Sequence, residues 1–130
     1  MSQFSPDLIK SANRNWAAAE RLNTGPVRDR TTAGYLYGIA AECAVKARYR
    51  SLHWTKDSRD GAAFAHFPAI KQKLRDELSG RLDGGLVRFA EDSYLRGWAI
   101  DIRYSDGTCP DDKMLEMWRS DADTALATLL

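Results

Sequence analysis

The chain has 130 residues, of which 44% are hydrophobic, and a formal net charge of +1 at pH 7. This length and composition predict a single domain, residues 1–130, whose core is large enough to need no covalent or metal support. A nearly neutral charge excludes the general electrostatic attraction to nucleic acid that a strongly basic protein has. No apolar run approaches the roughly 20 residues of a membrane span. The first residues lack the basic and apolar parts of a signal peptide, so we expect a cytoplasmic protein with no membrane partner.

The two cysteines, Cys43 and Cys109, lie far apart and have neither metal-binding nor redox spacing. We expect Cys43 in the core and Cys109 in a loop, which suits a reducing compartment. We predict no metal site and no cofactor.

The first predicted helix begins at Ser5, a good N-cap residue, with Pro6 at the first helical position. Gly25 and the proline after it end this helix. Its apolar stripe consists of Leu8, Ala12, Trp16, Ala19 and Leu22.

The second predicted helix begins between residues 29 and 32 and continues to about Leu52. Small side chains in its middle would let neighbouring backbones approach closely, which is typical of the central helix of a bundle. These residues are Ala33, Ala40, Ala41, Ala44 and Ala47.

Residues 56–65 have no apolar stripe and are predicted as a loop. A third, shorter helix is predicted from Pro68 to Ser79, with Ile70, Leu74 and Leu78 on one face. The charged residues within it, 71–77, are mixed in sign and predicted to form a solvated face.

A fourth helix is predicted from Asp83 to Tyr104. The alternative for its last part is a short strand over Ala99–Tyr104. The side chains expected to face inward are Leu86, Phe89, Ala90, Tyr94 and Trp98.

The last predicted helix begins near Pro110, where Asp111 and Asp112 would complement the positive helix end. Its stripe is Met114, Leu115, Trp118, Ala122, Ala125, Leu126 and Leu129. Together these elements predict an all-α protein, an antiparallel bundle of four or five helices.

A charged pair interrupts the otherwise apolar second helix. Glu42 and Lys46 are four residues apart with the acid first, the order that favours pairing on a helix. The pair can be a simple helix salt bridge, or two polar side chains held in a cleft.

A second motif follows at the end of the predicted fourth helix, Trp98-Ala-Ile-Asp101-Ile-Arg103-Tyr104. Together with residues 33–47 and with His66-Phe-Pro-Ala-Ile70, it makes the chain resemble the HEPN family of small helical proteins over roughly residues 8–130. The resemblance implies a helical bundle that forms a homodimer. It also implies binding of nucleotide or RNA, or ribonuclease activity in a toxin–antitoxin or defence system, with a nucleotidyltransferase or antitoxin partner protein.

The catalytic signature of the active HEPN nucleases is an arginine and a histidine with four to six residues between them. Arg103 stands where that arginine is expected, but positions 108–110 hold Thr108, Cys109 and Pro110. The spacing also occurs at Arg48/His53 and at Arg59/His66, outside the family's usual location. We therefore assign no catalytic residue, and expect His66 to order the entry to the third helix.

The remaining polar residues fit a phosphate-binding site. Arg103 and Lys46 could hold phosphate oxygens, with Glu42 or Asp101 orienting them and Tyr104 contacting the base or ribose. The structural alternative is an internal bridge from Arg103 to Glu42 or to Asp101, which would only tie helices together.

Basic residues also gather near the end of the second helix, where Arg48, Arg50 and His53 are interleaved with aromatic residues. They could contact nucleic acid. Cations at a helix C-terminus are also explained by their attraction to the free carbonyl groups there, and the nearly neutral overall charge favours this explanation.

The sequence therefore predicts an HEPN-like protein that binds nucleotide or RNA and lacks the usual ribonuclease activity. Two alternatives remain open. One is a divergent, metal-independent ribonuclease that uses Arg103. The other is a bundle whose ligand is another protein.

Overall fold

The computed structural model describes residues 7–53, 65–78 and 84–130, and this part of the chain contains helices and turns but no strand. The all-α prediction is confirmed. The elements are α1 (Leu8–Thr24), α2 (Arg30–His53), α3 (Ala69–Leu78), α4 (Gly84–Val87), η3 (Arg88–Ala90), η4 (Ile100–Tyr104) and α5 (Asp112–Leu129). None of the helices in these ranges is long and apolar enough to cross a membrane.

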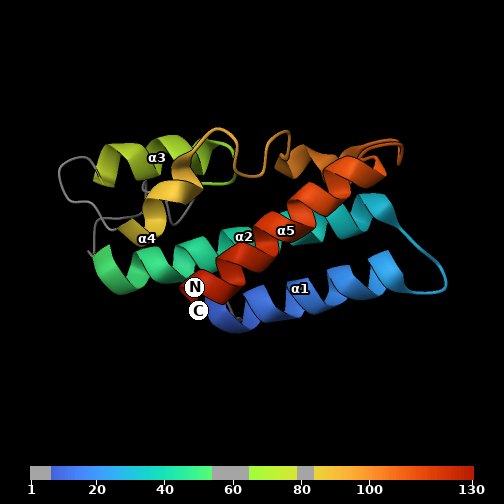
Figure 1. The fold of residues 1–130 in the computed structure, drawn as a ribbon, viewed down its shortest axis with the longest axis horizontal. Coiled ribbons are helices and arrows are strands. Elements are labelled where there is room, and N and C mark those ends of the chain that lie inside the picture. Colours follow the sequence, from blue (N-terminus) through green and yellow to red (C-terminus); the bar gives the residue numbers. More distant parts are fainter. Residues whose placement is uncertain (1–6, 54–64, 79–83) are drawn as a thin grey trace, which may run out of the picture.

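Helix α2 is the centre of the bundle (Figure 1). Helix α1 runs alongside it, and α5 crosses it obliquely. The short helices α3 and α4 cover the C-terminal part of α2, and η4 lies near its N-terminal part. The small residues of α2 permit this arrangement because Ala33, Ala40, Ala41 and Ala44 are all fully buried.

Side-chain caps fix the starts of the long helices. Asp7 accepts the backbone N–H of Lys10 at 2.9 Å and caps α1, whereas Ser5, the predicted cap, lies outside the described residues. Asp111 caps α5 in the same way through the N–H of Met114, at 2.8 Å. An acidic cap satisfies a free N–H and also matches the positive end of the helix.

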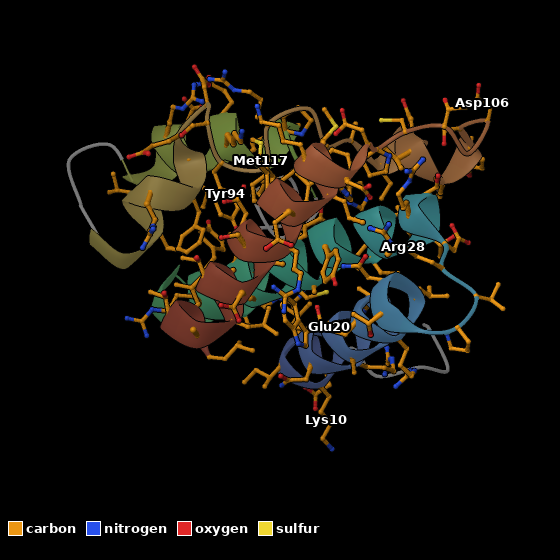
Figure 2. The ribbon with its side chains drawn as sticks, turned by 45° about the vertical axis from the view of Figure 1, so that its right-hand side comes forward. Lys10, Glu20, Arg28, Tyr94, Asp106 and Met117 are labelled. Carbon is orange, nitrogen blue, oxygen red and sulfur yellow. The ribbon has the colours of Figure 1, made fainter. Side chains whose placement is uncertain are left out.

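A polar contact joins the three long helices. Glu20 of α1 accepts hydrogen bonds from the hydroxyl of Tyr37 on α2 at 2.6 Å and from Nε of Arg119 on α5 at 2.7 Å (Figure 2). Burial, followed by the hydrogen bond to Glu20, raises the pKa of Tyr37 to about 12. Burial also raises the pKa of Glu20, but the hydrogen bonds from Arg119 and Tyr37 outweigh it and leave that pKa lowered.

The predicted fourth helix is wrong, although its inward-facing residues are correct. Residues 84–104 form the single turn α4, two short 3₁₀ helices and a run of turns over residues 92–97. The short strand considered for residues 99–104 is also wrong, because most of this segment is η4. The five residues predicted to face inward are nevertheless all buried: Leu86, Phe89, Ala90, Tyr94 and Trp98.

Helix α5 explains why residues 92–97 leave the helical path. The carboxylate of Asp121 accepts the N–H of Leu95 at 2.9 Å, and Nε1 of Trp118 donates to the carbonyl of Arg96 at 2.9 Å. The hydroxyl of Tyr94, which points from this segment toward α5, donates to the Asp121 carbonyl (Figure 2). Leu95 and Gly97 have φ angles of +47° and +82°, which an α-helix cannot contain. Side chains distant in sequence thus replace the hydrogen bonds of a continuous helix.

The indole of Trp98 lies directly on α2. Its Nε1 donates to the carbonyl of Gly34 at 3.1 Å, and a Cβ added at Gly38 would stand only 1.9 Å from its Cε2 atom. Trp98 therefore occupies space that exists only because residue 38 has no side chain.

One residue that was predicted on a solvated face is buried. Lys71 is 5% exposed, whereas its neighbours Gln72 and Lys73 are exposed as predicted.

The free cysteines agree with expectation, since Cys43 is buried and Cys109 exposed.

Candidate functional site

Glu42 is the most buried acidic side chain of the described residues, at 3% exposure. Its carboxylate accepts the backbone N–H of Phe67 at 2.9 Å, lies 2.8 Å from Nδ1 of His66 and pairs with Nζ of Lys46 at 3.4 Å. We call these four residues the Glu42 cluster. The cluster holds the chain at the entry to α3 against the middle of α2, as we predicted for His66.

The carboxylate of Glu42 is engaged within the Glu42 cluster, whereas the side chain of His66 is 49% exposed. The Glu42 side chain is 4% exposed and that of Lys46 11%, so neither presents an open surface to a large ligand. A buried carboxylate that accepts a backbone N–H is expensive to remove, because that N–H would lose its partner. The helix salt bridge predicted between Glu42 and Lys46 is present. The same Glu42 carboxylate also contacts His66 and Phe67 at the entry to α3.

Arg103 and Tyr104 form a different surface. Both are exposed, Tyr104 to 75%, and the guanidinium carbon of Arg103 lies 4.8 Å from the centre of the Tyr104 ring. The Arg103 guanidinium also interacts with the side chain of Tyr35 on α2, and this contact is the main reason why the pKa of Arg103 is raised. We call Tyr35, Arg103 and Tyr104 the Arg103–Tyr104 surface.

Tyr35 connects this surface to the core. Its ring stacks on Trp98 with a centroid distance of 6.3 Å and an interplanar angle of 17°. Because Trp98 is itself fixed by Gly34 and Gly38, the exposed surface rests on a rigid support.

The structure does not bring the five predicted phosphate-site residues together. Tyr35 and Glu42 are seven residues apart on α2, about 10 Å along the helix axis. Within the described ranges, Arg103 forms no ion pair with Glu42 or with Asp101, so neither of the internal bridges considered from sequence is present. Arg103, Tyr104 and Asp101 are exposed on η4, whereas Glu42 and Lys46 lie on α2 beside the entry to α3.

Acidic residues are numerous around the start of α2 and the turn after η4. Arg28 pairs with Asp112 at 2.8 Å, and Arg30 lies 3.9 Å from the same carboxylate. Asp106 is at the tip of the loop that follows η4, with Arg28 on the α2 side (Figure 2). The positive charges of Arg28 and Arg30 are therefore offset by a carboxylate, and this end of the molecule does not present a continuous basic surface.

The basic residues near the end of α2 are remote from this surface. Arg48 is exposed and Arg50 half-buried, and Arg48 is thirteen residues from Tyr35, about 20 Å along the axis. The side chain of His53 lies outside the described residues, as does Arg59. Neither of the alternative arginine–histidine pairs is therefore described.

Tyr35 was not predicted as a residue of this site, and Trp98 was predicted only to face inward. Both support the Arg103–Tyr104 surface. The sequence signal for the position of Trp98 was Gly38, a helical glycine among small residues. Within residues 7–53, 65–78 and 84–130, no group of three or more histidine, cysteine, aspartate or glutamate side chains is arranged to hold a metal ion.

Comparisons with protein-family models, with curated proteins and with solved structures give no match to this chain. The HEPN resemblance therefore stays a prediction.

Proposed function

We propose that this protein is an HEPN-like bundle that binds a nucleotide, or an unpaired base of RNA, on the Arg103–Tyr104 surface. The observation that carries the proposal is the exposed Arg103 guanidinium held over the exposed Tyr104 ring. A base can stack on tyrosine or on the guanidinium plane, and the outward N–H groups of arginine match phosphate oxygens.

The charge around the surface favours a small ligand. Asp101 and Asp106, which are exposed and within three residues of Arg103 in the sequence, would repel an extended phosphate backbone, but a single nucleotide or one base with its phosphate needs only the charge of Arg103. The rigid support from Tyr35 and Trp98 lowers the ordering cost of binding.

Calorimetry on the full chain tests the proposal with the nucleoside monophosphates and a short single-stranded RNA. We expect at least one of them to bind. Arg103→Ala and Tyr104→Ala should each weaken binding by about tenfold, the loss of a charge-assisted hydrogen bond or of a stacking contact. Lys113→Ala, an exposed cation on α5, is the matched control and should bind like the wild type. Failure of all ligands to bind, or equal binding by Arg103→Ala, would overturn the proposal.

The HEPN resemblance adds that the chain acts as a homodimer in a toxin–antitoxin or defence setting, with a nucleotidyltransferase or antitoxin partner. Sedimentation equilibrium tests the first part: a concentration-independent monomer mass would contradict it.

A further inference from the structure

An open pocket of about 500 Å³ lies between α3 and residues 92–99, and it is lined by none of the residues predicted to bind phosphate or nucleic acid. Its volume is within the range of small-molecule sites, roughly 300–1,000 Å³. Lys71, Arg75 and Arg96 supply its cationic side chains, and Asp92 its one carboxylate. Pro68, Leu95 and Trp98 add apolar wall.

Lys71 is the unusual member of this cationic pocket. It is 5% exposed, yet its ammonium group makes one hydrogen bond to the described part of the chain, to the carbonyl of Asp92 at 3.1 Å. An ammonium group has three donors, so two of them have no protein acceptor there. Buried polar groups without partners are rare in native proteins, and a ligand is one reason for them.

The two arginines differ in how they are held. Arg75 is fixed, since it donates to the carbonyl of Ala90 at 3.0 Å and to the carboxylate of Asp92 at 2.9 Å. The exposed guanidinium of Arg96 has no acceptor at hydrogen-bonding distance among the residues described. Lys71 and Arg96 therefore have donors to offer, and Arg75 contributes a fixed charge.

The pocket has an excess of positive charge. Three cations and one carboxylate leave a net charge of +2, which matches a doubly charged anion. Burial, with Arg75 and Arg96 acting in the same direction, lowers the pKa of Lys71, whereas Asp92 and Asp121 oppose this. A bound anion would relieve both the burial penalty and the repulsion among the cations.

We propose that the cationic pocket binds a small phosphomonoester, with its phosphate on Lys71 and Arg96 and its organic group beside Pro68 and Trp98. A dianionic phosphate would balance the net charge of +2 and accept hydrogen bonds from the free donors of Lys71 and Arg96. The apolar side of the pocket would contact the organic group of the ester. The pocket is separate from the Arg103–Tyr104 surface, so this proposal does not depend on the proposed function.

Calorimetry and NMR titration of the full chain with phenyl phosphate test the pocket, with phenyl sulfate as the isosteric monoanion and inorganic phosphate as the ligand without an organic group. We expect phenyl phosphate to bind several-fold more tightly than either, and to shift the indole N–H signal of Trp98. Lys71→Met and Arg96→Gln should each weaken binding by about tenfold or more, as for a lost hydrogen bond to a charged group.

The matched controls are Lys73→Gln, an exposed lysine on the same helix, and Arg103→Ala, and both should bind phenyl phosphate like the wild type. Arg96 is exposed, so its variant keeps the test valid if Lys71→Met fails to fold. No binding of phenyl phosphate, equal binding of phenyl sulfate, or unchanged binding by Arg96→Gln would overturn the proposal. If Arg103→Ala loses nucleotide binding but keeps phenyl phosphate binding, the two sites are separate, as proposed.

Discussion

Replacing Gly38 by alanine sets two physical effects against each other. Alanine is the better helix former, so the substitution in the interior of α2 would stabilise the protein by about 1 kcal/mol if only helix propensity mattered. The added Cβ would, however, stand 1.9 Å from Cε2 and 2.1 Å from Nε1 of Trp98, much closer than any real contact.

The indole must therefore move, although it is 1% exposed and packed in the core. Its displacement breaks the hydrogen bond to the Gly34 carbonyl, and a buried N–H without a partner costs about 1–3 kcal/mol. Overpacking of the core adds about 1–3 kcal/mol. After the propensity gain is subtracted, we expect Gly38→Ala to lower the free energy of unfolding by about 1–5 kcal/mol.

Urea denaturation followed by far-UV circular dichroism measures this change. Gly34→Ala is the graded control, because a Cβ there would lie 3.0 Å from Pro110 and Trp118, and its loss should be smaller. In a Trp98→Ala background the obstruction is gone, and Gly38→Ala should then be neutral or stabilising. A wild-type-like or raised stability of Gly38→Ala in the native background would refute the reasoning.

The remaining predictions concern two carboxylates and the two thiol groups. Glu42→Ala should cost about 2–4 kcal/mol in urea denaturation, because the buried N–H of Phe67 loses its acceptor. The lowered pKa of Glu20 means that its contribution to stability is complete above the unfolded-state value near 4.5 and is lost as the pH falls through the folded-state value. The free energy of unfolding of Glu20→Gln should therefore fall less steeply between pH 5 and 3 than that of the wild type. A thiol reagent should modify Cys109 at once but Cys43 only on unfolding, since Cys43 is buried and burial raises the pKa of its thiol.

Each of these three predictions can be contradicted by a control variant or by a specific result. Glu116→Ala removes an exposed carboxylate and should cost no more than about 0.5 kcal/mol, so an equal loss in Glu42→Ala would contradict the role of the Glu42 cluster. Parallel stability curves for Glu20→Gln and the wild type would show that the three-helix contact contributes nothing to acid sensitivity. Reaction of two thiols in the native protein would place Cys43 at the surface.

The long helices could be predicted from sequence because their signals are local. The apolar stripe of α5 and the acidic residues at its start depend on residues three or four apart, and the structure agrees with both. The same reasoning failed at residues 84–104. Here the apolar spacing correctly identified the buried side chains, but the path of the chain depends on hydrogen bonds from Asp121 and Trp118, which are distant in sequence.

The candidate site shows the same division. Pairing of Glu42 with Lys46 is a property of one helix and could be predicted, whereas its contact with Phe67 joins two elements and could not. The burial of Lys71 had a signal in the sequence, because Lys71 shares helical spacing with Leu74 and Leu78, which were predicted on the apolar face. The mixed charges around it concealed this signal.

The central claim is that the Arg103–Tyr104 surface binds a nucleotide or an RNA base, and an NMR titration of the ¹⁵N-labelled protein with nucleoside monophosphates and short single-stranded RNA tests it most directly. The account predicts shifts that concentrate at Tyr35, Arg103 and Tyr104 and disappear in Arg103→Ala. Shifts confined to other parts of the chain, or none at saturating ligand, would contradict it.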